Sequence, residues 1–372
     1  MTLTICPKQG VDYFRTMATF HPLRVQSVER ETAESVVVTL DIPEALTGAF
    51  AFQAGQYLTL KSNIGGQEVR RSYSLCSAPH ELTWQVGIKK VPGGLYSTYA
   101  NEALVPGDEV EVMEPQGRFV SPEGKGLHHL GVAAGSGITP ILSQIKSLLH
   151  EDPLCTYTLF YSNKTAGSTM FREALQDLKD KHLDRLRVFY LLTREPVDAE
   201  LLSGRLTGDR CGHMLQAFCA EARPDVAYLC GPEEMILGCK DALLAFGMAE
   251  DAIRFELFTT AGAAKQGVTD AVAAEGSSDE RELRVVLDGV TTSTVVSKDK
   301  SLLDAALDAG LDAPYSCLGG VCCTCRAKLV QGEADMAVNY ALEPGEVERG
   351  YVLSCQAHAK GEGPLELDFD QQ

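Results

Sequence analysis

Four cysteines lie within nine residues of this chain, in the stretch PYSCLGGVCCTC at residues 314–325, and Cys355 follows thirty residues later. Cys317 and Cys322 are separated by four residues, and Cys322 and Cys325 by two. Four thiolates can share one metal centre only if the chain brings them together. Residues 317–325 are therefore expected to form a tight loop, and the segment around Cys355 is expected to return to it.

The spacing of these cysteines indicates which metal they bind. C-x4-C-x2-C followed by a distant cysteine is typical of a 2Fe-2S cluster. A structural zinc ion also binds four thiolates, but zinc sites usually use two C-x2-C pairs, and only one is present here. The pattern favours the cluster, with Cys317, Cys322, Cys325 and Cys355 as ligands. The additional thiol of Cys323 is expected to point away from its two neighbours.

Composition excludes several classes of protein. A chain of 372 residues is expected to form two or three domains. No apolar run is long enough for a membrane span, and Lys8 and Asp12 interrupt the apolar stretch that a secretory signal needs, so we expect a cytoplasmic protein without a membrane partner. Twelve cysteines in that reducing compartment indicate metal ligands or free thiols. The net charge of -18 argues against nucleic acid as a partner.

Three regions of different texture follow one another along the chain, after an extension at residues 1–17. Residues 18–124 alternate short β-rich runs with Gly/Pro turns, which predicts an antiparallel β-barrel. Residues 125–260 alternate strand-like and helical runs, which predicts a parallel-sheet α/β domain. Residues 261–281 are rich in Ala, Gly and Ser and are expected to be a linker. Residues 282–372 begin with a hairpin turned at Asp288-Gly289 and a helix that ends at Gly310.

Three further motifs, taken in order, resemble the ferredoxin-NADP reductase superfamily. They are RRSYSL at 70–75, GSGITP at 135–140 and CGPEEM at 230–235. The cysteine loop resembles that of plant-type ferredoxins, and the hairpin and helix before it match their β-grasp fold. The resemblance implies a multidomain α+β and α/β protein whose barrel binds FAD and whose α/β domain binds a nicotinamide nucleotide.

The resemblance assigns flavin-binding roles in the first region. Arg71 would neutralise the flavin diphosphate, Tyr73 would cover the isoalloxazine ring, and Ser74 would hydrogen-bond near its reactive N5. A strand with a cross-strand charge pair would give the same residues. The stretch GGLYST would supply N–H groups and hydroxyls to the pyrophosphate, although a bare turn would look similar. The candidate flavin ligands are Arg71, Ser72, Tyr73, Ser74, Gly93, Gly94, Ser97 and Thr98.

The second region carries the candidate nucleotide site. Its glycines precede Thr139 as candidate N-cap and Pro140 as the expected first helical residue, and a helix N-terminus attracts a pyrophosphate. The resemblance places the thiol of Cys230 beside the nicotinamide, although a buried cysteine can also be a small hydrophobe. It also places an acidic or aromatic residue over the flavin. The candidate residues are Gly135, Ser136, Gly137, Thr139, Pro140, Cys230, Gly231, Pro232, Glu256 and Phe258, with Ser74, Cys230 and Glu256 as the catalytic set.

Nucleotide preference depends on the end of the second strand of this region. Ser162 and Lys164 lie there, with Arg194 as a third candidate, and no acidic residue is present to hold a bare 2′-hydroxyl. The sequence thus favours NADPH over NADH.

The order of the domains and nearly the whole chain, from Met17 to residue 357, resemble the reductase subunits of the phenylacetyl-CoA epoxidase family. That resemblance implies electron transfer from NAD(P)H through FAD and a 2Fe-2S cluster to a di-iron oxygenase. There are two alternatives. The chain could be a reductase of another aromatic-ring or steroid hydroxylase, or it could be a non-catalytic iron-sulfur or zinc module. Acidic side chains of the last region could steer it towards a basic oxygenase surface: Asp299, Asp304, Asp308, Asp312, Glu343, Glu346 and Glu348.

Overall fold

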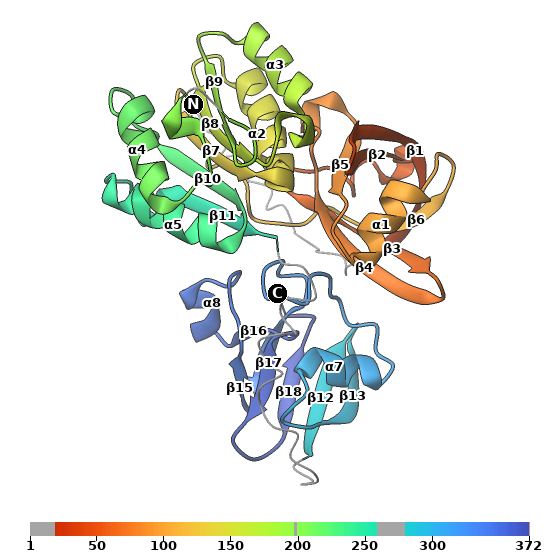
Figure 1. The fold of residues 1–372 in the computed structure, drawn as a ribbon. Helices are drawn as coiled ribbons and strands as arrows, with labels where there is room; N and C mark the ends of the chain where they lie inside the picture. Colours follow the sequence, from red (N-terminus) through yellow and green to blue (C-terminus); the bar gives the residue numbers. More distant parts are fainter. Residues whose placement is uncertain (1–18, 197–198, 259–279, 372) are drawn as a thin grey trace, which may run out of the picture.

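The computed structural model describes residues 19–196, 199–258 and 280–371. They form a barrel domain, a parallel-sheet domain and a C-terminal domain, which lies beneath the other two in Figure 1. The extension at residues 1–17 lies outside the described residues, as does the predicted linker except for its last two residues. The last of them, Arg281, begins a strand.

The barrel domain is one antiparallel sheet of six strands in the order β4-β3-β6-β1-β2-β5. A bridge between Leu75 and Val86 joins the β4 end of the sheet to β5 and closes it, as expected for a barrel. Alternate residues of its strands, such as Leu58 and Leu60, are fully buried because they point into the barrel. Its elements are β1 (Phe20–Thr32), β2 (Ser35–Asp41), β3 (Tyr57–Ile64), β4 (Gln67–Ser74), β5 (Trp84–Lys89), α1 (Leu95–Glu102) and β6 (Glu109–Met113).

The parallel-sheet domain has five strands in the order β11-β10-β7-β8-β9, with helices on both faces (Figure 1). Alternate residues of each strand feed two separate cores, so that Tyr157 packs under α2 while Phe160 packs under α4. This confirms the predicted α/β fold. Its elements are β7 (His128–Ala134), α2 (Ile138–Glu151), β8 (Thr156–Asn163), α3 (Arg172–Lys181), β9 (Leu186–Leu192), α4 (Gly208–Cys219), β10 (Val226–Gly231), α5 (Glu233–Ala245) and β11 (Ile253–Leu257).

The strand order of this domain indicates where a ligand-binding crevice is expected. The chain runs outward from β7 through β8 to β9, then returns to the other side of β7 to form β10 and β11. Ligands of such sheets bind at the carboxyl ends of the strands where the order reverses. Here that point lies between β7 and β10.

The C-terminal domain combines a mixed five-stranded sheet, β13-β12-β18-β14-β16, with a two-stranded sheet, β15-β17. Asp288 and Gly289 both have positive φ, as a tight hairpin turn requires, and Gly310 follows the end of the helix, so the expected β-grasp elements are present. The elements are β12 (Arg281–Leu287), β13 (Val290–Val296), α7 (Leu302–Asp308), β14 (Arg326–Gln331), β15 (Glu333–Met336), α8 (Pro344–Glu348), β16 (Tyr351–Leu353), β17 (Ala357–Lys360) and β18 (Leu365–Asp368).

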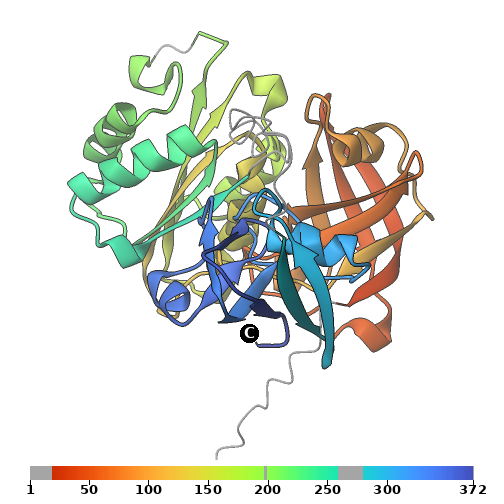
Figure 2. The ribbon, with the colours of Figure 1, turned by 90° about the horizontal axis from the view of Figure 1, so that it is seen from below.

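The C-terminal domain presents its cysteine loop to the barrel domain, and Figure 2 shows it lying across both other domains. The Tyr57 hydroxyl of β3 donates a hydrogen bond to the carbonyl oxygen of Cys322. The Ser72 hydroxyl of β4 bonds that of Ser316. We call the contact surface of the C-terminal domain with the other two domains the seam. It also contains the ion pair of Arg70 with Asp312, at 2.8 Å, and the hydrogen bond of 2.6 Å from the Tyr340 hydroxyl to Glu233 of the parallel-sheet domain.

The best-formed ion pair of the seam joins Arg118 to Glu346. The Arg118 guanidinium donates two hydrogen bonds, of 2.7 and 2.8 Å, to the two carboxylate oxygens of Glu346, and Arg326 adds a contact of 3.3 Å. Glu346 is only 4% exposed. The hydrogen bonds from Arg118 lower the pKa of this carboxyl to about 2, so it stays charged at any ordinary pH.

We predict that Glu346→Gln weakens the seam by about 2 kcal/mol near neutral pH, because one charge-assisted hydrogen bond is lost. The folded-state pKa lies below the unfolded value of 4.5, so the stabilisation is complete above pH 4.5 and is lost as the pH falls towards 2. The difference in melting temperature between wild type and variant should thus stay constant from about pH 5 to 8 and shrink below that range. Glu348→Gln, on the same helix but exposed, is the control. An equal effect of both variants would contradict the prediction.

Candidate functional site

The glycine loop after β7 lies at the switch point and touches β10 directly. A Cβ atom on Gly137 would lie 2.1 Å from the carbonyl oxygen of Cys230, so only glycine fits here. The Tyr161 hydroxyl holds the loop by donating a hydrogen bond of 2.9 Å to the carbonyl of Gly135. Backbone N–H groups of a loop and helix start are thereby fixed at the mouth of the crevice, as an anionic pyrophosphate requires.

The start of α2 differs from the prediction. Thr139 is not the N-cap: Gly137 holds that position, and Thr139 and Pro140 are the second and third helical residues. The reason is that residues Gly135–Gly137 already form a 3-10 turn that leads into the helix. The Thr139 hydroxyl accordingly donates a hydrogen bond of 3.0 Å to the Ser136 carbonyl.

Two lysines flank the glycine loop. Lys164 follows β8 and lies beside the end of that strand, where Ser162 is also found. Lys89, at the end of β5 in the barrel domain, places its ammonium 3.7 Å from where a Cβ of Gly135 would lie. Burial and the charge of Lys164 lower the pKa of Lys89. Sequence reasoning missed Lys89, since nothing in KKVPGG shows that this strand end meets a loop of another domain.

The three candidate catalytic residues come together. Cys230 and Glu256 are direct neighbours in the parallel pairing of β10 with β11. The Ser74 hydroxyl of the barrel domain donates a hydrogen bond of 3.2 Å to a carboxylate oxygen of Glu256. Burial raises the pKa of Glu256 to about 7, and burial, with Glu256 nearby, raises the pKa of the Cys230 thiol. The carboxyl can therefore hold or release a proton near neutral pH, while the thiol stays protonated.

Strand β4 separates the candidate flavin residues onto two faces. Arg71 and Tyr73 share one face, as the period of a strand dictates. The Arg71 guanidinium donates to the carbonyl of Arg70, and among the described residues it forms no ion pair with a carboxylate. Ser72 and Ser74 lie on the opposite face of the strand. The Ser72 hydroxyl there bonds that of Ser316 in the C-terminal domain, so Ser72 points away from the face that carries Arg71 and Tyr73.

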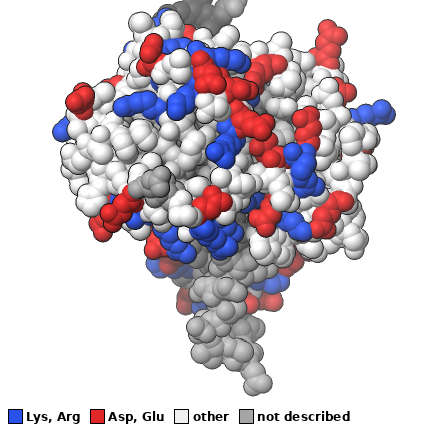
Figure 3. All heavy atoms as spheres, turned by 45° about the horizontal axis from the view of Figure 1, so that its top comes forward, with Lys and Arg blue, Asp and Glu red and all other residues white. Residues whose placement is uncertain are grey.

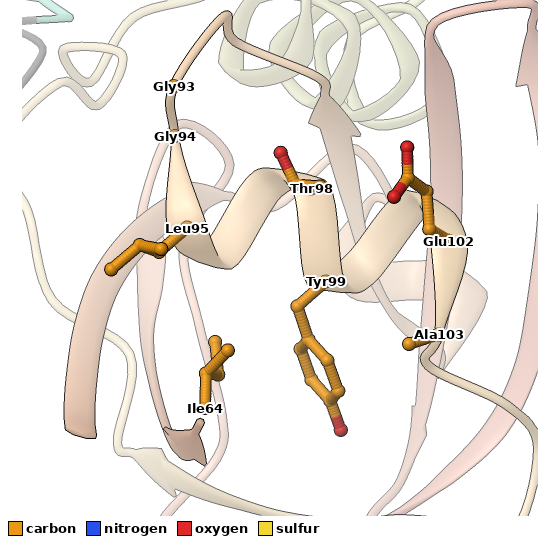
Figure 4. Close-up of a pocket in the computed structure, with 8 residues that line it drawn as sticks. All are labelled: Ile64, Gly93, Gly94, Leu95, Thr98, Tyr99, Glu102 and Ala103. Carbon is orange, nitrogen blue, oxygen red and sulfur yellow. The ribbon is translucent and has the colours of Figure 1, made fainter. Parts of the chain in front are cut away.

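A hollow of about 370 Å³ opens at the start of α1, and Figure 4 shows its lining. Gly93, Gly94 and Thr98 border it. Ser97 does not: its hydroxyl accepts a hydrogen bond from the N–H of Val91 and donates to the carbonyl of Gly94, which fixes the turn. The other lining residues are Ile64, Leu95, Tyr99, Glu102 and Ala103.

The four predicted cysteine ligands gather as two pairs. The thiols of Cys317 and Cys322 are hydrogen-bonded to each other, and so are those of Cys325 and Cys355. In the part of the chain that the structure describes, no group of three or more His, Cys, Asp or Glu side chains surrounds one metal position. Two neighbouring pairs fit a two-iron cluster, which needs two thiolates at each iron, better than a single tetrahedral zinc.

The loop also supplies N–H donors to these sulfur atoms. The N–H of Gly319 donates to Cys317 Sγ at 3.3 Å, and the N–H of Cys317 reaches Cys322 Sγ at 3.5 Å. The hydrogen bond from the Cys322 thiol lowers the pKa of Cys317 to about 6, so the loop already favours a thiolate. The thiol of Cys323 points elsewhere, towards the carbonyl of Ala341 at 3.5 Å.

The remaining candidates lie at the ends of strands β10 and β11. Gly231 ends β10, and Pro232 is the N-cap of α5. Phe258 follows β11 and is 40% exposed. Acidic and basic side chains are interspersed on the face that Figure 3 shows, without one continuous basic stripe there. Among the helices of the described residues, none is long and apolar enough to cross a membrane.

Three family models match successive parts of the chain. The model described as "Oxidoreductase FAD-binding domain" matches residues 22–120, and "Oxidoreductase NAD-binding domain" matches residues 132–241. The model "2Fe-2S iron-sulfur cluster binding domain" matches residues 285–360. The matched cofactors are those that the motifs predict, in the same order.

Curated proteins and solved structures resemble the chain over most of its length. One component of the 1,2-phenylacetyl-CoA epoxidase from Escherichia coli (strain K12) is 42% identical, covering 92% of this chain and 95% of that protein. The ferredoxin reductase component of 3-ketosteroid-9-alpha-monooxygenase from Mycolicibacterium smegmatis is 33% identical, covering 94% and 97%. The structure of phthalate dioxygenase reductase superposes with a TM-score of 0.59 at 25% identity, covering 94% of this chain and 98% of that one.

We predict that replacing Cys317, Cys322, Cys325 or Cys355 singly by Ser removes iron from the purified protein or cripples its binding, because each thiol belongs to one of the two pairs. Cys323→Ser is the matched control in the same loop and should keep its iron, since its thiol points to Ala341. Iron analysis of the five variants tests the assignment. Loss of iron from Cys323→Ser alone would contradict it.

Proposed function

This chain belongs to the family of reductase components that serve oxygenases through FAD-binding, NAD-binding and 2Fe-2S domains, and from that membership we propose that its own oxygenase is a di-iron epoxidase of phenylacetyl-CoA. It is an NAD(P)H-dependent oxidoreductase that transfers electrons. The observation that carries the proposed substrate is the similarity to the Escherichia coli epoxidase component, which exceeds that to the steroid monooxygenase components. The alternative, that the chain is a reductase of a steroid hydroxylase, rests on the similarity to the steroid monooxygenase components.

The chemistry that bound FAD would supply is acceptance of a hydride from the nicotinamide and transfer of single electrons to the 2Fe-2S cluster. The chain's residues supply position and electrostatics. Arg71, which has no carboxylate partner among the described residues, is proposed to neutralise the flavin diphosphate, and Tyr73 to cover the isoalloxazine ring. The hollow beside Gly93, Gly94 and Thr98 is proposed to hold the pyrophosphate, with Ser97 shaping the turn behind it.

Proton handling is proposed for the contact between the two N-terminal domains. Glu256 has a pKa of about 7, so its carboxyl can exchange a proton at the pH of the reaction. Ser74 bonds that carboxyl and is proposed to relay the proton towards the ring nitrogen. Cys230 lies on the strand next to Glu256 and is proposed to border the nicotinamide as a neutral, polarisable surface.

Nucleotide binding is proposed at the crevice between β7 and β10. The pyrophosphate would lie on the N–H groups of Gly135–Gly137 and the start of α2, with Gly231 and Pro232 opposite. Lys89 would then offset the charge of the pyrophosphate and Lys164 that of a 2′-phosphate, which explains why two ammonium groups are placed near each other. Phe258 is proposed to lie over the flavin when the nucleotide is absent.

We predict that NADPH is the preferred donor and that Lys164→Ala lowers kcat/KM for NADPH by about tenfold, because a charge-assisted hydrogen bond to the 2′-phosphate contributes about 1.5 kcal/mol or more. The value for NADH should change little. Lys181→Ala, an exposed lysine at the end of α3, is the control for loss of a surface charge. A higher kcat/KM with NADH in the wild type, or equal losses for both nucleotides, would contradict the prediction.

The C-terminal domain is proposed to deliver electrons to a basic surface of the oxygenase. The acidic side chains expected to face that surface do not include Glu346, because Glu346 is buried in the seam with Arg118. Asp304 in α7 and Glu348 in α8 remain exposed. Such charges raise encounter rates at low ionic strength.

We predict that this protein with NADPH supports oxygen-dependent epoxidation of phenylacetyl-CoA when mixed with its cognate oxygenase subunits, and that the rate falls as salt rises. Product formation is measured at about 20 and 300 mM NaCl, since the Debye length shortens over that range. Reduction of a small dye by NADPH is the control and should change little with salt. Activity with a steroid hydroxylase but none with the epoxidase would overturn the proposed substrate and leave the reductase activity intact.

A further inference from the structure

We infer that Tyr57 is the positioning residue that holds the cluster loop against the flavin-binding strand and so sets the rate of electron transfer between them. This inference rests on the flavin-to-cluster transfer described above. It assigns a role to a residue of the barrel domain that none of the sequence motifs includes. Its hydroxyl contacts the backbone of Cys322, a proposed iron ligand.

The backbone of Tyr57 is part of the flavin site's framework. Tyr57 is the first residue of β3 and pairs directly with Ser74, the last residue of β4. On its other side, its N–H and carbonyl exchange two hydrogen bonds with Gln116, at 2.8 and 3.0 Å. The residue is therefore fixed from both sides, and on one side it is paired with the strand that carries Arg71, Ser72, Tyr73 and Ser74.

The side chain of Tyr57 crosses the seam between the two domains. It is 4% exposed, and its hydroxyl lies 3.2 Å from Thr324 Oγ1 in addition to its bond with the Cys322 carbonyl. Thr324 Oγ1 in turn donates to Gln116 Oε1 at 3.3 Å. These bonds form a closed network around the peptide groups that link two proposed ligands, Cys322 and Cys325.

The packing of Tyr57 suits this role. Gly117 packs on the ring: a Cβ atom there would lie 3.0 Å from Tyr57 Cδ1. The ring is thereby held in one orientation, with its hydroxyl aimed at the loop.

The other contacts of the seam cannot replace this one. Arg118 with Glu346 and Tyr340 with Glu233 hold the C-terminal domain through side-chain bonds that do not reach the backbone of a proposed ligand. Ser72 contacts Ser316, which only precedes the first ligand. Tyr57 alone, among these seam contacts in the described residues, bonds the backbone of a proposed ligand. Because small misplacements of reacting groups lower rates steeply, loss of this hydroxyl should lower the rate of cluster reduction.

The test is Tyr57→Phe, which keeps the packed ring and removes only the hydroxyl. In rapid mixing with NADPH, bleaching of the flavin should be unchanged, whereas the cluster should be reduced about tenfold more slowly, the range found for outer partners of metal ligands. Hydrogen exchange of the amides in residues 316–326 should become faster, a readout that does not depend on turnover. Iron content and melting temperature are measured alongside.

Tyr340→Phe is the matched control, because it also removes a tyrosine hydroxyl that bridges two domains, but one that bonds Glu233 and not the backbone of a proposed ligand. Unchanged cluster reduction in Tyr57→Phe, or an equal slowing in both variants, would overturn the inference. If Tyr57→Phe loses its iron, Gln116→Leu, which removes only the acceptor of Thr324, is measured instead and should slow cluster reduction to a smaller extent. Failure of flavin reduction in the wild type would instead refute the proposed function.

Discussion

The backbone of Gly137 lies so close to the carbonyl oxygen of Cys230 that no other residue fits, and the rest of the site depends on this approach. It joins the loop after β7 to the end of β10 at the point where the strand order reverses. A wider separation would pull the helix start of α2 away from the crevice and displace β10 from its neighbours. The nucleotide loop and the candidate catalytic residues are consequently parts of one rigid framework.

From that contact, a continuous series of neighbours runs through all three domains. Cys230 pairs with Glu256 in the parallel sheet, and Glu256 accepts a hydrogen bond from Ser74 of the barrel. Ser74 pairs with Tyr57, whose hydroxyl bonds the carbonyl of Cys322. Each step is a backbone pairing or a hydrogen bond between domains, so the candidate nucleotide, flavin and cluster sites are linked through the secondary structure itself.

The sequence predicted those features that local physics determines. The β-rich runs, the alternation of strands and helices, the Asp288-Gly289 turn and the spacing of the cysteines each depend on residues near one another in the chain, and each is present. The prediction that Thr139 is the N-cap of α2 was wrong, because the 3-10 turn before the helix shifts its start. Lys89 and Tyr57 were missed, because their roles arise only where separate domains meet. No periodicity or spacing in one segment encodes such a contact.

Two carboxyls at contacts between domains differ in their surroundings. Glu346 contacts two guanidinium groups, which keep it ionised and make it a fixed structural charge. Glu256 accepts a hydrogen bond from a serine hydroxyl and forms no ion pair within the described residues, so desolvation dominates and its pKa rises to about 7. The residue type is the same, and the difference in pKa follows from the group that the barrel domain supplies to each carboxyl, the guanidinium of Arg118 or the hydroxyl of Ser74. A carboxylate that holds domains together must not titrate, whereas one that exchanges protons must, and the docking of the barrel domain against its two neighbours provides both environments.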